Sequence, residues 1–124
     1  MRRCGSLTNV TILRMNVLFI CSQNRLRSPT AEQVFSTWPG VSCTSAGTNH
    51  DAEVPLSAEL VQWADLIFVM EGAHREKLRS RFREHLRDRR VVCLDIPDEF
   101  EFMDPELIQR LLAKVPPHLP FVPT

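Results

Sequence analysis

One cysteine in the sequence stands in a setting that could make it a nucleophile. Cys21 follows an apolar run and begins the stretch 21–29, CSQNRLRSP, which has the form C-x5-R-S. The nucleophilic form of a cysteine is its thiolate, and a helix N-terminus or a nearby arginine lowers thiol pKa values toward the range of activated cysteines, roughly 3.5–7.5. Five intervening residues also let a loop curl so that its backbone N–H groups face inward and bind an anion. The spacing therefore predicts a nucleophilic thiolate at the base of a phosphate-binding loop.

The residues that close this stretch suit the same chemistry. Arg27 carries a planar guanidinium that can bind two oxygens of one phosphoryl group. Ser28 can donate a hydrogen bond to the thiolate, and Pro29 suits the first turn of a helix, where a missing N–H costs nothing. The predicted phosphate-binding residues are Ser22, Gln23, Asn24, Arg25, Leu26, Arg27 and Ser28.

Short apolar runs alternate with helical patterns from Met15 onward, and this alternation must position the loop. The runs that predict buried strands are 17–20, 41–45, 66–70 and 91–94. The segments with helical spacing or helix-start signals are 29–38, 57–63, 72–87 and 105–114. Strands separated by helices imply parallel crossovers and one three-layer α/β domain. Ligands bind beyond the carboxyl ends of such strands, so the loop after the first strand is the expected site.

Composition limits the classes of function. The 124 residues fit one domain, and 15 basic against 15 acidic residues argue against a nucleic-acid binder with a wholly basic surface. No apolar run approaches the roughly 20 residues that cross a bilayer, so no membrane partner is expected. The four cysteines and four histidines lack ligand spacing, which predicts no metal site and no cofactor. We expect reduced thiols and a cytoplasmic protein.

The two ends of the sequence differ from the middle. Residues 1–14 lack the apolar core of a signal peptide and are interpreted as a loose N-terminal extension. Residues 15–115 are expected to form the domain, and the proline-rich tail 116–124 is expected to be extended. Residues 75–90 contain eight Lys and Arg, which predicts a solvated helix face with Glu–Arg pairs; the alternative is a positive rim that attracts anionic partners.

Three stretches together resemble one family, the low-molecular-weight protein tyrosine phosphatases. They are 17–35 (VLFICSQNRLRSPTAEQVF), 45–48 (SAGT) and 64–70 (ADLIFVM). The resemblance implies a four-stranded parallel sheet with helices on both faces. It also implies hydrolysis of phosphomonoesters through a phosphocysteine intermediate, without a metal. By motif position Cys21 would be the nucleophile, Arg27 would hold the transition state, Asn24 would shape the loop and Ser28 would bond to the thiolate.

The resemblance also implies a general acid, an Asp in the loop after the last strand, for which the sequence offers three candidates. Residues 96–98, IPD, resemble the start of the family's acid loop, so Asp98 is favoured over Asp95. Asp104 is the alternative, because Asp104-Pro105 matches a family dipeptide, although helix capping alone explains it. Phe100 and Phe102 stand where the family's aromatic pocket residues usually occur.

The sequence departs from the family at several positions. No aromatic residue occurs in 49–55, where members carry part of the pocket wall, and this weakens the expectation of phosphotyrosine specificity. Leu26 replaces a frequent cysteine, so no disulfide within the loop is expected, and Gln23 replaces a frequent glycine, which predicts a less permissive backbone. Substrates are expected to be phosphoproteins or small phosphomonoesters.

Two other functions remain open from the sequence. Arsenate reduction on the same fold would need further thiols, and Cys43 and Cys93 fall in predicted strands rather than in a mobile segment. A non-catalytic phosphate-binding module would explain the unusual loop and the missing pocket wall. A sugar-transport phosphocarrier also uses a cysteine loop after a first strand, but Arg27 fits hydrolysis better.

Overall fold

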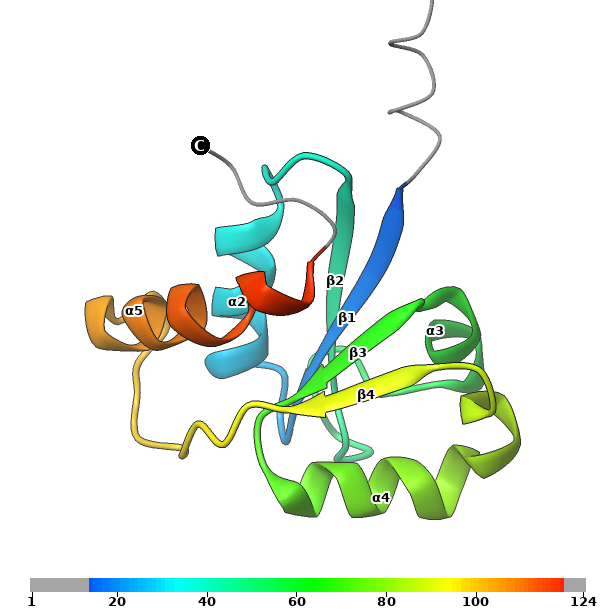
Figure 1. Cartoon of the computed structure of the whole chain (residues 1–124). Helices are drawn as coiled ribbons and strands as arrows, with labels where there is room; N and C mark the ends of the chain where they lie inside the picture. The colour runs from blue at the N-terminus through cyan, green and yellow to red at the C-terminus, as the bar shows by residue number, and fades with distance from the viewer. Residues whose placement is uncertain (1–13, 120–124) are drawn as a thin grey trace, which may run out of the picture.

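The computed structural model describes residues 14–119, so the expectations for 1–13 and 120–124 lie outside it. Within that range the strands are β1 (Met15–Cys21), β2 (Val41–Gly47), β3 (Leu66–Val69) and β4 (Arg90–Cys93). All neighbouring strands pair in parallel, in the order β2-β1-β3-β4 (Figure 1). The prediction of a four-stranded parallel sheet is confirmed.

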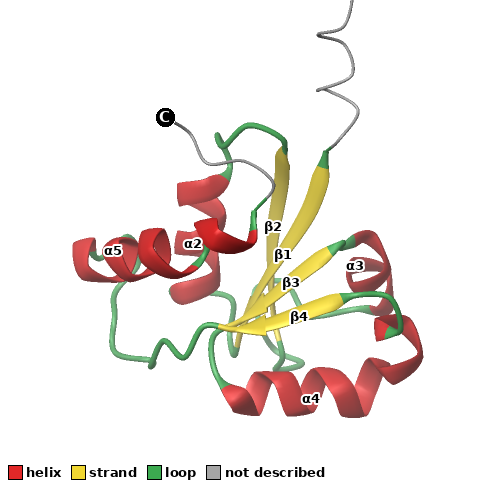
Figure 2. Ribbon diagram, in the orientation of Figure 1, coloured by secondary structure: helices red, strands yellow, loops and turns green. Residues whose placement is uncertain are grey.

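Two helices cover each face of this sheet and complete the three layers. The helices are α2 (Arg27–Phe35), α3 (Ala58–Trp63), α4 (Gly72–Phe82) and α5 (Pro105–Lys114). Figure 2 shows α2 and α5 on one side of the sheet and α3 and α4 on the other. No helix within residues 14–119 is long and apolar enough to span a membrane.

The central strand β1 is apolar from Val17 to Cys21 because both of its faces are buried there. Along a strand successive side chains point to opposite faces. Val17 and Phe19 enter the core under α2 and α5, whereas Leu18 and Ile20 enter the core under α3 and α4. Phe19 stacks on Phe35 of α2 and on Phe68 of β3, with ring centroids 5.9 Å and 5.3 Å apart. This packing fixes the strand whose last residue is Cys21.

The helix boundaries differ from the predictions in three places. The helix predicted over 29–38 begins at Arg27 and ends at Phe35 as α2. The helix predicted over 72–87 ends as α4 at Phe82 and continues as the 3-10 turn η1 (Arg83–Leu86). The start of the tail was expected to be extended, but Pro116–His118 form the 3-10 turn η2. Prolines fit the first positions of a helical turn, where no N–H is needed. Leu119 follows this turn and packs in the core at 9% exposure.

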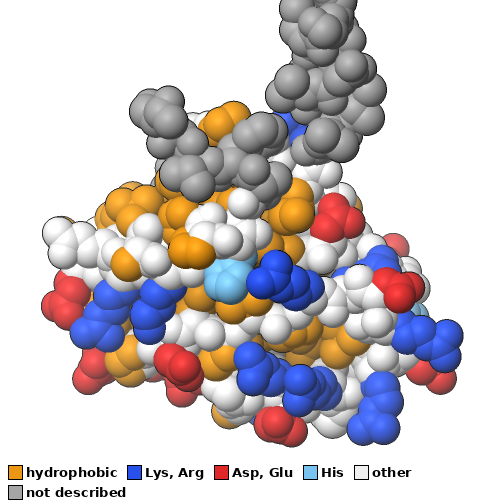
Figure 3. Space-filling model, viewed as in Figure 1, with side chains coloured by type: hydrophobic (Ala, Val, Ile, Leu, Met, Phe, Trp, Pro, Cys, Tyr) orange, Lys and Arg blue, Asp and Glu red, His pale blue; other side chains and the backbone are white. Residues whose placement is uncertain are grey.

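The basic segment 75–90 lies on α4, η1 and the start of β4, and most of its arginines are exposed. Figure 3 shows Lys and Arg side chains gathered on this part of the surface. The expected Glu–Arg pairs are wrong. Among residues 14–119 no Lys or Arg of this segment lies within 4.0 Å of a carboxylate.

Candidate active site

The loop between β1 and α2 places Cys21 at the carboxyl edge of the sheet, as the motif predicts. Cys21 ends the buried part of β1, which begins at Val17, and its side chain is only 3% exposed. Its Sγ lies 3.0 Å from Ser28 Oγ, in the first turn of α2. The loop 22–26 closes the turn between these residues, so the thiol lies at the N-terminus of a helix, where the helix dipole favours negative charge.

Asn24 supports the loop from inside. It is 5% exposed, and its Nδ2 donates to Ser28 Oγ (3.0 Å) and to Ser45 Oγ (2.9 Å). Its φ of 59° is left-handed, a conformation that asparagine tolerates better than most residues. Gln23 does not have a positive φ, so the loop does not need the conformational freedom of a glycine at this position.

The end of β2 holds the loop from below. Gly47 has no room for a side chain, because a Cβ there would lie 2.5 Å from Ala52 Cβ and 2.5 Å from the Ser22 carbonyl oxygen. The next residues clamp the loop backbone: Thr48 N–H donates to Cys21 O (2.9 Å) and Asn49 N–H to Ser22 O (3.0 Å). The residues of the SAGT motif therefore support the phosphate loop because their backbone lies close to it.

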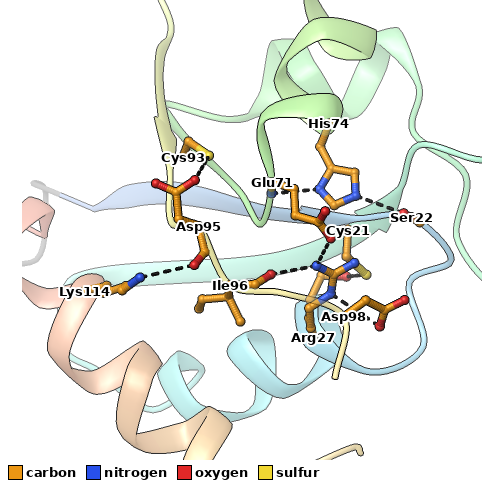
Figure 4. A network of polar contacts seen from close by, with 11 residues as sticks. Cys21, Ser22, Arg27, Glu71, His74, Cys93, Asp95, Ile96, Asp98 and Lys114 are labelled. Carbon is orange, nitrogen blue, oxygen red and sulfur yellow. Dashed lines mark hydrogen bonds and ion pairs between the residues drawn. The ribbon is translucent and has the colours of Figure 1, made fainter. Parts of the chain in front are cut away.

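Arg27 is buried, and its guanidinium is held in one orientation (Figure 4). Its Nη1 donates to the Ile96 carbonyl oxygen at 2.7 Å and to the Glu71 carboxylate. Its Nε faces Asp98, with Oδ1 at 3.7 Å. Both hydrogen bonds use Nη1, so within residues 14–119 the edge formed by Nε and Nη2 makes no hydrogen bond and faces only the Asp98 carboxylate. A guanidinium edge of this kind can bind two oxygens of one phosphoryl group.

Two residues that contact the loop were missed from the sequence, Glu71 and His74. Glu71 is the N-cap of α4. His74 Nδ1 accepts the Glu71 backbone N–H at 3.1 Å, and the His74 backbone N–H donates to the Glu71 carbonyl oxygen at 3.0 Å. Glu71 also accepts from Arg27, and His74 Nε2 lies 2.9 Å from Ser22 Oγ (Figure 4). Their spacing, Glu-x-x-His after an apolar strand, is that of a capping box; it could have indicated the start of a helix but not the contact with the loop.

A hollow of about 210 Å³ opens above Cys21. Its lining residues are Cys21, Ser22, Gln23, Arg25, Leu26, Arg27 and Asp98. The other acid candidate, Asp104, is not among them; it caps α5, its Oδ1 accepting the Glu106 N–H at 2.9 Å. Phe100 is packed in the core at 7% exposure and Phe102 is exposed, so neither forms the expected pocket wall.

The other described cysteines lie away from Cys21. Cys43 pairs with Val17 in the sheet, four positions before Cys21, which is about 13 Å along a strand. Burial, with a smaller contribution from Glu32, raises the pKa of Cys43 to about 12. Cys93 lies two strands across from Ile20, about 10 Å away, and burial raises its pKa as well. Neither thiol is placed to react directly with Cys21.

Comparison with known proteins tests the resemblance. No protein-family model matches the chain. Over an alignment of 113 residues the chain is 29% identical to the protein named "Probable low molecular weight protein-tyrosine-phosphatase EpsP" from Ralstonia nicotianae, covering 72% of this chain and 77% of that protein. The chain is similar in sequence to a low-molecular-weight protein tyrosine phosphatase.

Solved structures confirm the low-molecular-weight phosphatase fold. The YwlE arginine phosphatase from Geobacillus stearothermophilus superposes with a TM-score of 0.64 at 23% identity, covering 78% of this chain and 88% of that one. The tyrosine phosphatase Wzb from Escherichia coli K30 gives a TM-score of 0.63 at 21% identity, covering 79% and 91%. One is named for arginine and the other for tyrosine, so the shared fold does not select a substrate.

Proposed function

We propose that this chain is a cysteine-dependent phosphatase that hydrolyses phosphomonoesters through a phosphocysteine intermediate. The observation that carries the proposal is the grouping of a thiol, a fixed guanidinium edge and a carboxylate around one hollow of about 210 Å³. Similarity in sequence to a low-molecular-weight phosphatase supports the same reaction class.

In the first step Cys21 attacks phosphorus in line with the ester oxygen. The S–P bond forms as the P–O bond to the leaving group breaks. Negative charge on the equatorial oxygens is stabilised by the Nε/Nη2 edge of Arg27 and by the loop amides, which are fixed before the reaction. The hydrogen bond from Ser28 stabilises Cys21 as a thiolate, both before attack and when it leaves in the second step.

Asp98 is proposed as the general acid. Its protonated carboxyl gives a proton to the leaving oxygen, and its carboxylate then takes a proton from the water that attacks the phosphocysteine. The S–P bond breaks, inorganic phosphate leaves and the thiolate is restored. Two observations favour Asp98 over Asp104: it lines the hollow, and its Oδ1 lies 3.7 Å from Arg27 Nε.

The proposed substrate class is set by phosphate recognition. No aromatic side chain lines the hollow, so the described site offers the phosphoryl group more contacts than it offers a tyrosine ring. We therefore propose phosphomonoesters as the class, borne by a protein or a small molecule. Hydrolysis of aryl and alkyl phosphates should be compared, because a ring-specific site would favour the aryl ester at equal leaving-group acidity.

The decisive test is Cys21→Ser assayed with an aryl phosphate. Turnover should be lost, and rapid quenching of the unaltered protein should trap one phosphoryl group on the peptide that contains Cys21. Cys43→Ser is the matched control, since Cys43 lies in β2 away from the loop and should be dispensable for turnover. Retained turnover in Cys21→Ser, or binding of vanadate with no turnover by the unaltered protein, would overturn the proposal.

A further inference from the structure

His74 joins helix α4 to the phosphate loop through both nitrogens of its ring. The ring is 2% exposed. Its Nδ1 receives the backbone N–H of Glu71 at 3.1 Å, and its Nε2 lies 2.9 Å from Ser22 Oγ, the residue next to Cys21. The proposed reaction does not use this histidine, and the sequence pattern assigned it no role.

The Glu71 bond fixes which nitrogen carries the proton. A backbone N–H can only donate, so Nδ1 must accept and holds no hydrogen. The neutral ring then carries its proton on Nε2 and donates it to Ser22 Oγ. A hydroxyl that accepts in this way keeps its own proton for another acceptor.

The surroundings keep the ring neutral. Burial, and next the charge of Arg27, lower the pKa of His74 to about 4. The charged groups that act on the ring are Arg27 from α2, Glu71 and Lys77 from α4, and Asp98 from the segment after β4. At neutral pH the ring is thus a donor with a fixed direction.

We infer that His74 is a positioning residue, which orients the Ser22 hydroxyl so that its proton points toward an anion in the hollow above Cys21. Ser22 lines that hollow and is the loop residue that follows the nucleophile. The kinetic consequences of this inference rest on the proposed function. The binding of inorganic phosphate tests the inference without any turnover. His74 acts through Ser22 and does not itself line the hollow.

The test separates this role from helix capping. In His74→Gln the amide oxygen can still accept the Glu71 N–H, as glutamine does at this position of a capping box, while the bond to Ser22 is lost. Ser22→Ala removes the hydroxyl itself. Each variant should weaken the binding of inorganic phosphate and lower kcat/KM for an aryl phosphate, each about tenfold, because a hydrogen bond to a charged group is lost.

The double variant His74→Gln/Ser22→Ala should be no worse than Ser22→Ala alone, since both changes remove the same donor. His85→Gln, on η1 and bonded to Gln62, is the matched control and should bind phosphate normally. Additive losses in the double variant, or unchanged phosphate binding in His74→Gln, would overturn the inference. If the unaltered protein binds phosphate but shows no turnover, the proposed function fails while this inference is still tested.

A spectroscopic signature checks the proton directly. With 15N-labelled histidine, the His74 ring should appear as the neutral form protonated at Nε2 from pH 7 down to about pH 5, as a pKa of about 4 requires. Ser22→Ala should shift the Nε2 resonance, because the bond to the hydroxyl is gone. A ring protonated at Nδ1, or one that titrates near the usual 6.5, would contradict the assignment.

Discussion

The loops after β1 and after β4 face each other across the hollow, yet they are built in opposite ways. The first has a buried, hydrogen-bonded frame, because Cys21, Asn24 and Arg27 are each at most 5% exposed, although Arg25 between them is exposed. The second loop carries Asp98, whose side chain is 64% exposed. Its Oδ1 lies 3.7 Å from Arg27 Nε. Ile96 and Phe100 anchor the second loop in the core on either side of Asp98.

The difference matches what each loop has to do. Binding of the transferring phosphoryl group requires donors that are fixed before the reaction, since any reorganisation is added to the barrier. Proton transfer to a leaving group requires reach toward substrates of different shape, which an exposed carboxylate provides. The largest kinetic effects should therefore come from the buried loop, and losses specific to poor leaving groups from the exposed one.

The sharpest challenge to this comparison is Arg27→Lys. Lysine keeps the charge but lacks the planar fork that Glu71 and the Ile96 carbonyl hold in place, so it cannot present two parallel donors. We expect kcat/KM to fall about a thousandfold. Steady-state kinetics with an aryl phosphate measure the loss, and Arg79→Lys on the exposed face of α4 serves as the control. A loss below tenfold would show that charge alone suffices.

The exposed loop is tested by comparing Asp98→Ala with Asp104→Ala. Asp98→Ala should lower kcat about a hundredfold for esters with poor leaving groups, and much less for activated ones, with stability nearly unchanged. Asp104→Ala should do the reverse: kinetics are kept, and stability falls by about 1 kcal/mol because α5 loses its N-cap. The measurements are kcat and the denaturant midpoint of both variants. If Asp104→Ala lost activity and Asp98→Ala lost stability instead, the general acid would be Asp104.

The contact beneath the buried loop is tested by Gly47→Ala. The added Cβ must displace Ala52 or the Ser22 carbonyl oxygen, so the loop shifts. We expect a loss of about 1–3 kcal/mol in stability, as in other overpacked sites, together with a drop in kcat/KM of about tenfold. Gly72→Ala is the matched control, because a Cβ there meets nothing within 4 Å. Equal behaviour of the two variants would mean that the loop is not held by this close approach.

The same contrast explains which parts of the site could be predicted from the sequence. Local sequence signals predict the buried loop: a strand buried on both faces, a helix start and the C-x5-R-S spacing. The structure brings together the residues that these signals name, Cys21, Asn24, Arg27 and Ser28. The contacts of Glu71 and His74 with that loop join residues more than 40 positions apart and depend on the β1–β3 pairing. No local pattern encodes that distance.

Predictions for the exposed segment were weaker because its sequence carries two signals at once. The dipeptide Asp-Pro at 104–105 fits both a family motif and a helix start. In the structure Asp104 is the N-cap of α5. Phe100 reads as a pocket aromatic, but it is buried in the core, with the Arg110 guanidinium 5.0 Å above its ring. Whether an aromatic residue faces a pocket or a core depends on the path of the chain, which composition does not determine.

One further prediction concerns the stability of the protein in acid, and its effect is absent at neutral pH. The pKa of His74 is lowered to about 4 in the folded chain, against about 6.5 when unfolded, so between these values the unfolded state binds more protons. Stability must therefore be complete above pH 6.5 and fall as the pH drops toward 4. His74→Gln removes this proton, and its denaturant midpoint should decline less than that of the unaltered chain from pH 7 to 4.5. Because the two proteins differ only at position 74, the difference between the two curves isolates His74, and parallel curves would place the proton uptake elsewhere.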